Sequence, residues 1–137
     1  MGCIMPSPTN RPADEIQRLR VLKEYRIIDT PPEEKFDDLT RLVSQICEVP
    51  IALISLVESQ RQWFKSRVGV DVQESLRNGA FCAYTILQSD LFIVPDALAD
   101  ARFVDNPFVT HPPNIRFYAG APLVTNDGLP IGTLCVI

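Results

Sequence analysis

The longest apolar stretch of the chain runs from Val49 to Val57 and is apolar at almost every position. A strand with this pattern has no polar side to turn towards water, so both of its faces must be covered by other elements. It is too short to cross a bilayer, which takes about 20 apolar residues. Residues 62–68 are predicted to pair with it in a hairpin, with Glu58–Arg61 as the turn. The stretch therefore predicts a buried strand inside a layered domain.

Two helices are predicted before this strand. From Pro12 onwards, apolar residues recur at helical spacing, and a proline suits the first turn of a helix. For the second helix, Thr30-Pro31-Pro32-Glu33 fits a capping box, with Thr30 as the N-cap residue, and Pro50 ends the helix. The apolar positions are Ile16, Leu19 and Leu22 in the first helix and Phe36, Leu39, Leu42, Val43, Ile46 and Cys47 in the second.

A second hairpin is predicted at the carboxyl end of the chain. Its strands, Phe117–Thr125 and Leu129–Ile137, flank the turn signal Asn126-Asp127-Gly128. Pro122 lacks a backbone donor and predicts an edge position or a bulge. The final apolar run needs cover, and no later residues are there to provide it. We therefore expect an amino-terminal piece of a longer protein.

The remaining segments complete one domain. A looser stretch from Gly69 to Gly79 leads to a short helix at residues 80–87, and residues 91–94 form a brief strand. Residues 97–116 are predicted to be irregular, with one helical turn at most. The resulting order predicts the α+β class, with helices packed on a mainly antiparallel sheet. Residues 1–11 are rich in Pro, Ser, Thr and Asn and are predicted to be a flexible arm before a domain at 12–137.

Composition excludes several classes of function. The net charge of −4, without a basic run, argues against nucleic acid as a partner. The first residues lack the features of a signal peptide, so we expect a cytoplasmic protein with reduced thiols and no membrane partner. Four cysteines without a C-x-x-C pair, and His111 as the sole imidazole, predict neither a zinc site nor a catalytic triad or dyad.

The segment Asp96–Tyr118 is the candidate for a functional site, because a long irregular loop in a compact domain is often functional. Its aromatic rings are suited to the wall of a small-molecule pocket, and its Arg, Asn and Asp side chains to directional hydrogen bonds. The alternative is structural: its first two phenylalanines pin the loop to the core, and Arg102 pairs with Asp100 or Asp105. The polar and aromatic residues concerned are Asp100, Arg102, Phe103, Asp105, Asn106, Phe108, Arg116, Phe117 and Tyr118.

The cysteines are predicted to be mainly structural. Cys82 lies between Phe81 and Ala83 on the short predicted helix, which favours a buried thiol. A reactive thiol would need a lowered pKa, and Arg77 is the nearby cation in the sequence. Both Cys47 and Cys135 sit in apolar patterns and are predicted to be core residues.

An ordered series of short motifs runs along nearly the whole chain. It includes Arg18-Leu-Arg-Val-Leu22, Tyr25-Arg-Ile-Ile-Asp-Thr-Pro-Pro-Glu33, Pro50-Ile-Ala-Leu-Ile-Ser-Leu56, Arg61-Gln-Trp-Phe-Lys-Ser66, Asp100-Ala-Arg-Phe103, Ile115-Arg-Phe-Tyr-Ala-Gly-Ala-Pro-Leu123 and Gly132-Thr-Leu-Cys-Val-Ile137. Together they resemble a GAF domain over about residues 14–137. The resemblance is to the bacterial subgroup at the amino terminus of sensor histidine kinases and diguanylate cyclases or phosphodiesterases.

The resemblance implies a central antiparallel sheet with helices on both sides and a closing helix, absent from this chain, that often carries a dimer contact. It also implies a ligand pocket under the helix and loop between the third and fourth strands. The ligand-binding residues expected from it are Phe81, Cys82, Tyr84, Thr85, Asp96, Arg102, Phe103, Asn106, Phe117, Tyr118 and Ala119. A homodimer is expected on the same basis.

Some residues depart from the family pattern. Tyr84 stands where members of the subgroup often carry His, and Cys82 is followed by Ala83 where bilin-binding domains have His. A bilin is therefore not expected, and the cofactor stays unknown. GAF-type reductases of free methionine sulfoxide use several cysteines. This sequence shows no such cluster, and Cys82 would need a resolving thiol.

The sequence thus predicts a non-catalytic sensory domain. An unidentified small molecule, or a change at a partner surface, would shift the terminal helices and act on a downstream signalling domain, such as a histidine kinase or diguanylate cyclase. Two alternatives remain: a ligand-free GAF dimerisation module, and a thiol redox sensor or reductase that uses Cys82.

Overall fold

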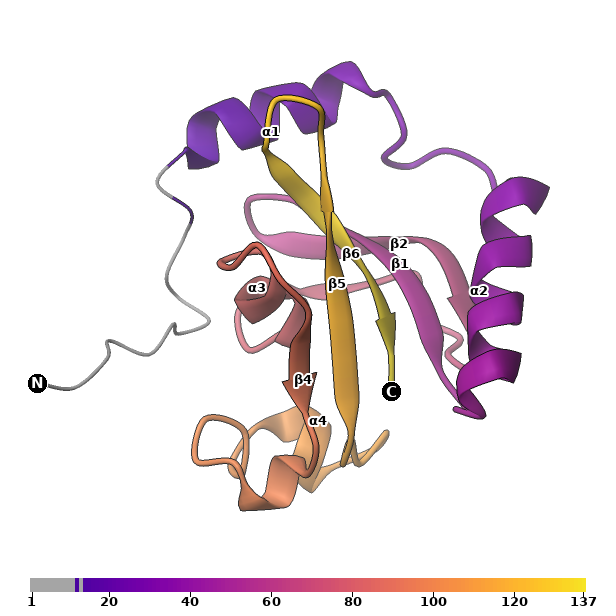
Figure 1. The fold of residues 1–137 in the computed structure, drawn as a ribbon, viewed down its shortest axis with the longest axis vertical. Coiled ribbons are helices and arrows are strands. Elements are labelled where there is room, and N and C mark those ends of the chain that lie inside the picture. Colours follow the sequence, from indigo (N-terminus) through magenta and orange to yellow (C-terminus); the bar gives the residue numbers. More distant parts are fainter. Residues whose placement is uncertain (1–11, 13) are drawn as a thin grey trace, which may run out of the picture.

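The computed structural model describes residue 12 and residues 14–137, and the arm predicted at residues 1–11 lies outside them. Within the described part, six strands form one antiparallel sheet in the order β3-β2-β1-β6-β5-β4 (Figure 1). The strands are β1 (Ala52–Val57), β2 (Arg61–Val68), β3 (Glu74–Leu76), β4 (Phe92–Val94), β5 (Tyr118–Val124) and β6 (Pro130–Val136). The helices are α1 (Glu15–Glu24), α2 (Glu34–Cys47), α3 (Phe81–Thr85), the 3-10 turn η1 (Ala97–Ala99) and α4 (Pro107–Thr110). The predicted α+β class is confirmed.

Strand β1 lies inside the sheet, between β2 and β6, and all six of its residues are buried. Side chains alternate along a strand, so its two faces enter different clusters. Leu53 belongs to the main core on the α3 side, whereas Leu56 packs with Leu22 of α1 and Trp63. In Figure 1, α2 runs along β1 and β2, and α3 lies towards the opposite side of the molecule. Both faces of β1 are covered, as its uninterrupted apolar pattern predicted.

The carboxyl-terminal hairpin shows how a proline fits into a sheet. The ladder between β4 and β5 ends at Gly120, so Pro122 pairs only with Thr133 of β6 and its other side is an edge. A register shift follows directly, between Leu123 and Val124. The missing donor of Pro122 therefore leaves no ladder bond unmade, and the predicted edge position is confirmed.

The predicted capping box of α2 is wrong. The helix begins at Glu34, and Glu33 in the N-cap position makes no side-chain capping bond. Thr30 instead donates to the carbonyl of Ile27, and it accepts a 2.7 Å hydrogen bond from Nζ of Lys65. That ammonium group is fully buried and needs acceptors. A buried charge from β2 thus outcompetes the local cap.

Helix α2 turns an unexpected side towards the sheet. Thr40 is fully buried and bonds to Ser66 of β2 at 2.7 Å. Leu42 and Ile46 of the predicted apolar face are 52% and 71% exposed. Cys47, in the last turn, is exposed as well, so its assignment to the core is wrong, whereas Cys135 is buried as predicted.

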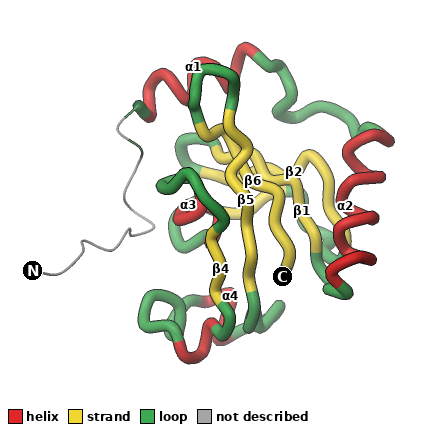
Figure 2. The backbone as a smooth tube through the Cα atoms, viewed as in Figure 1, coloured by secondary structure: helices red, strands yellow, loops and turns green. Residues whose placement is uncertain are grey.

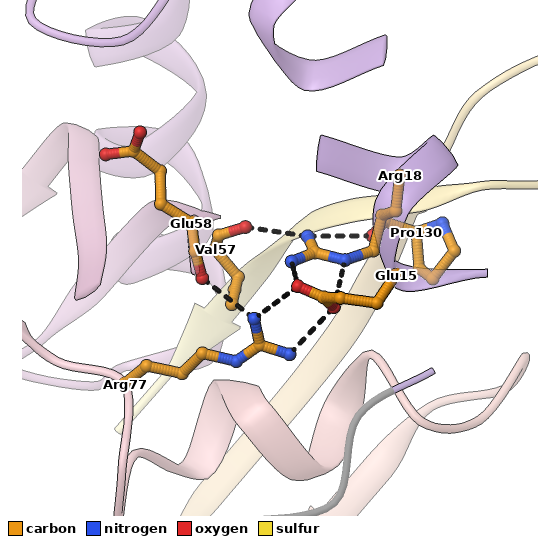
Figure 3. Close-up of polar contacts among 6 residues, drawn as sticks. All are labelled: Glu15, Arg18, Val57, Glu58, Arg77 and Pro130. Atoms are coloured by element: carbon orange, nitrogen blue, oxygen red, sulfur yellow. Dashed lines mark hydrogen bonds and ion pairs between the residues drawn. The ribbon is translucent and has the colours of Figure 1, made fainter. Parts of the chain in front are cut away.

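Helix α1 is anchored by a buried ionic cluster (Figure 3). The carboxylate of Glu15 accepts hydrogen bonds from Arg18 at 2.9 and 3.0 Å and from Arg77 at 2.9 and 3.1 Å. The Arg18 guanidinium also donates to the carbonyl of Val57 at 2.6 Å, and that of Arg77 to the carbonyl of Glu58 at 2.8 Å. Arg18 therefore joins the first helix to the end of β1, and Glu15 joins it to Arg77 in the loop after β3.

Candidate functional site

A cavity of about 370 Å³ lies between the sheet and the segments on its α3 side. Leu53, Phe64, Tyr118 and Cys135 line it from the sheet, and Ala80, Phe81 and Cys82 from the start of α3. Two loops contribute Val70, Asp71 and Val72 before β3 and Phe108, Pro112, Pro113 and Ile115 around α4, and the remaining lining residues are Ile51, Gln62, Ser75 and Ile137. Figure 2 shows how much of the chain between β4 and β5 is loop. The sheet thus forms the floor of the cavity, and loops form its rim.

The few polar groups of the cavity are mostly bonded to one another. The side-chain oxygen of Gln62 accepts from Ser55 at 3.1 Å, and its amide nitrogen donates to Ser75 at 2.6 Å. Asp71 is exposed at the rim and is the one ionisable carboxylate among the described lining residues. The chamber is therefore apolar, with a polar patch on β2 and a negative charge near its mouth.

Three of the residues expected from the family resemblance line this cavity, namely Phe81, Cys82 and Tyr118. Others lie behind its wall. Phe103 is fully buried and stacks on Phe81 with ring centroids 4.1 Å apart. Tyr84 stacks on Phe92, and the hydroxyl of Thr85 bonds to Tyr118. These side chains build the core that supports the cavity.

The polar members of the expected set are used in local structure. Arg102 forms two hydrogen bonds with Asp100, at 2.9 and 2.6 Å, and its hydrogen bonding lowers the pKa of that carboxyl. Asp96 caps η1, and Asn106 caps α4 while donating to the carbonyl of Gly79 at 2.7 Å. None of these side chains is among those that line the cavity. These contacts fit the alternative in which the polar residues of the long loop have a structural role.

Two further expected residues lie on β5 or next to it. Phe117 is 38% exposed, and Ala119 pairs with Ile93 and Val136 inside the sheet. The cavity wall is formed instead by residues that were not expected, from the loop before β3 and from the segment after Phe108. The prolines at 112 and 113 and the irregular stretch from Gly69 were the available sequence signals. Neither indicated that the two loops meet.

A cluster of sulfur and hydroxyl groups forms the base of the cavity. The sulfur atoms of Cys82 and Cys135 are 4.0 Å apart. Thr133 donates to Sγ of Cys82 at 3.1 Å, and the hydroxyl of Tyr118 does so at 3.4 Å. Arg77 is engaged with Glu15 and Glu58 instead. Hydroxyl and thiol donors, rather than a cation, surround Cys82.

These contacts shift the pKa values of the two thiols in opposite directions. The hydrogen bond from Cys135 contributes most to lowering the pKa of Cys82, to about 7, against the opposing effect of burial. Hydrogen bonds from Thr133, Tyr118 and Ser55 act in the same direction. The same contact with Cys82, together with burial, raises the pKa of Cys135. Cys82 is therefore the member of the pair that ionises first.

Two kinds of site are not found in the described part of the chain. Its His, Cys, Asp and Glu side chains form no group of three that could hold a metal ion. No helix between residues 14 and 137 is long and apolar enough to cross a membrane.

A six-stranded antiparallel sheet with helical cover and a loop-roofed cavity is the architecture of a GAF domain. The model of the GAF domain family matches residues 31–137, and the chain belongs to this family. It is 44% identical over 126 residues to a cyclic di-GMP phosphodiesterase of Pseudomonas aeruginosa. The match covers 92% of this chain and 22% of that protein, so the chain spans about a fifth of its relative.

Solved structures agree on the fold. The GAF domain of an Acinetobacter phosphoenolpyruvate-protein phosphotransferase matches with a TM-score of 0.58 and 16% identity, over 92% of this chain and 77% of that one. A type II free methionine-R-sulfoxide reductase of Thermoplasma acidophilum matches with a TM-score of 0.58 and 17% identity, over 84% and 75% of the two chains. At these identities, the likeness concerns the fold alone.

Proposed function

We propose that this chain is the sensory domain of a cytoplasmic signalling protein and that it binds a small molecule in the cavity between the sheet and α3. The observation that carries the proposal is the apolar chamber of about 370 Å³. This volume is within the range of ligand pockets in proteins, and an apolar wall with few polar groups is typical of them. The sensory role is in line with the family and with a relative that is a signalling enzyme.

The lining indicates the chemistry of the ligand. Rings of Phe64, Phe81 and Phe108 favour a flat, apolar molecule. The amide of Gln62 has hydrogen-bonding positions beyond those used by Ser55 and Ser75, so it can orient one polar group. Asp71 at the rim favours a neutral or cationic group there over an anionic one.

A route for the signal starts in the wall itself. Ile137, which follows β6, lines the cavity, and its N–H donates to the carbonyl of Ile51 at 2.9 Å. A ligand that contacts both residues differently in two states of the domain would bias the position of the last strand. Through the position of that strand, the ligand would act on the downstream output domain.

Thermal unfolding with a ligand panel tests the proposal. The panel holds cyclic nucleotides, haem, bilins and small aromatic metabolites. A ligand present at 100 times its Kd stabilises the native state by about 2.7 kcal/mol and raises Tm. Val70→Trp fills the cavity and is expected to abolish the shift, whereas Val124→Trp, at an exposed position outside the cavity, keeps it. An equal shift in both variants, or no shift with any compound in the wild type, contradicts the proposal.

The exposed side of α2 favours a second candidate, a dimerisation module. Leu39, Leu42 and Ile46 lie on one helix and are 47%, 52% and 71% exposed. Large apolar side chains gathered on one surface are typical of association sites. A second copy of the chain is the occupant proposed for this surface, in place of a ligand in the cavity.

A further inference from the structure

We propose that Cys82 and Cys135 form a peroxide-sensitive dithiol that closes to a disulfide at the base of the cavity. The two sulfur atoms lie 4.0 Å apart, although the residues are 53 positions apart in the sequence. A disulfide bond is about 2.05 Å long, so closure needs an approach of about 2 Å. Both side chains are free thiols and both line the cavity. This inference concerns covalent chemistry and does not depend on a reversible ligand.

The surroundings give the two thiols different roles. The hydroxyls of Thr133 and Tyr118 both donate to the sulfur of Cys82, and the Cys135 thiol lies within hydrogen-bonding distance of it. Hydrogen bonds to a thiolate stabilise it, and the thiolate is the nucleophilic form. Cys82 is therefore the group that reacts with the oxidant. Cys135, whose sulfur lies 4.0 Å away, is the resolving thiol.

The reaction balances with hydrogen peroxide as the oxidant. The Cys82 thiolate attacks one peroxide oxygen, an S–O bond forms, the O–O bond breaks, and the departing hydroxide takes a proton to become water. The Cys135 sulfur then attacks the sulfenic acid; the S–S bond forms, the S–O bond breaks, and a second water leaves with the Cys135 proton. The two thiols lose two electrons and the peroxide gains them. A dithiol small enough to enter the cavity reverses the reaction by thiol–disulfide exchange.

The burial of the two sulfur atoms limits which oxidants can reach them. Cys82 and Cys135 are 3% and 1% exposed, so a bulky disulfide has no direct access to either sulfur. The cavity leads from its rim, where Val72 is 60% exposed, to the pair. A small uncharged molecule such as hydrogen peroxide fits this route. Cys47 on α2 is exposed, so bulky and small oxidants alike can reach its sulfur.

The test is mass spectrometry of the reduced chain after hydrogen peroxide treatment, with all remaining thiols alkylated. A Cys3→Ser, Cys47→Ser background leaves only the proposed pair. The expected product has lost two hydrogens and yields one cross-linked peptide that contains both cysteines. In Cys135→Ala, oxidation is expected to stop at a sulfenic acid on Cys82, which dimedone traps. Two intact thiols after treatment, or oxidation of Cys135 in a Cys82→Ala variant at the wild-type rate, overturns the proposal.

A second measurement remains informative if the alanine variants fail to fold. Thr133→Val removes one donor to Cys82 and keeps the shape of the side chain. Alkylation by iodoacetamide, followed against pH, is expected to shift to higher pH in this variant, and disulfide formation near neutral pH is expected to slow. Ser44→Ala, which removes a hydroxyl on α2 far from the pair, is the matched control. An unchanged profile in Thr133→Val overturns the assignment of Cys82 as the attacking thiolate.

Discussion

Glu15 shows how much one carboxylate can contribute when it lies, partly buried, between two buried arginines. Burial opposes its ionisation, but hydrogen bonds from Arg77 and Arg18 outweigh this and lower its pKa from 4.5 to about 2. Arg18 is fully buried and Arg77 is 2% exposed, so neither can turn to water if the carboxylate is lost. Glu15 thus adds an ionic link to the attachment of α1, beside the bond of Arg18 to Val57 and the packing of Leu22.

The first prediction concerns the pH dependence of stability. Because the folded-state pKa of Glu15 is depressed, its contribution is present above pH 4.5 and is lost as the pH falls towards 2. A shift of this size corresponds to about 3 kcal/mol in full, and solvent screening of the partly exposed carboxyl reduces the contribution to about 1–2 kcal/mol. Glu15→Gln is expected to lower the free energy of unfolding by about that amount at pH 7 and by little at pH 2, as measured by urea denaturation. Glu24→Gln, at the exposed end of the same helix, should match the wild type; equal losses in both variants would refute the role of the cluster.

Among the elements, α4 depends on a residue that sequence reasoning assigned to a ligand. The Asn106 side chain accepts from the N–H of Phe108 at 2.8 Å and donates to the carbonyl of Gly79. It therefore both caps α4 and joins it to the segment that leads into α3. The wall of the cavity on this side is positioned by that double contact.

The second prediction is that Asn106→Ala destabilises the fold by about 1–2 kcal/mol, because an N-cap bond and a bond to a backbone carbonyl are both lost. Chemical denaturation measures the change. Asp105→Ala, at the exposed neighbouring position, is expected to change the free energy of unfolding by less than about 0.5 kcal/mol. If the two variants were equally stable, Asn106 would not be holding the loop.

At the scale of the whole molecule, the contact between α2 and the sheet is polar, whereas the exposed side of α2 carries large apolar side chains. Asp37, Thr40 and Ser66 form a hydrogen-bonded chain between helix and sheet, with distances of 2.6 and 2.7 Å. Leu42 and Ile46 are exposed on the same helix. This distribution is the reverse of that of a helix which packs on its own core, and it is the reason that a homodimer is proposed here.

The third prediction follows from this surface. Leu42→Glu is expected to shift sedimentation velocity profiles towards the monomer and to raise the dimer Kd at least tenfold, which corresponds to about 1.4 kcal/mol. Gln45→Glu adds a charge at another exposed position of α2 and is expected to leave association unchanged. A wild-type chain that stays monomeric at high concentration would reject the homodimer through this surface.

The order of the elements was predictable because its signals are local. The apolar run at Val49–Val57, the turn at Asn126-Asp127-Gly128 and the proline at 122 each act over a few residues, and the structure has the corresponding strand, hairpin and edge. The short strand β3 was missed, since its three residues carry no alternating apolar pattern. The family could also be predicted, because its motifs are strings of neighbouring residues.

The composition of the site was far less predictable. Phe81, Cys82, Tyr118 and, in the candidate loop, Phe108 were identified as site residues and do line the cavity, but Leu53 and Phe64 were not identified. Local patterns do not tell which loops meet above a sheet, because that depends on strand register and on contacts between distant segments.

Sequence patterns thus account for a buried central strand, two hairpins and an α+β plan, since backbone propensity and side-chain periodicity are properties of neighbouring residues. Contacts between residues that are far apart in the sequence were decided only by the tertiary structure. Buried Lys65 takes Thr30 away from the start of α2, and the pairing of β1 with β6 brings Cys135 to within 4.0 Å of Cys82. The cavity and its thiol pair exist because burial and long-range register bring together groups that are far apart along the chain.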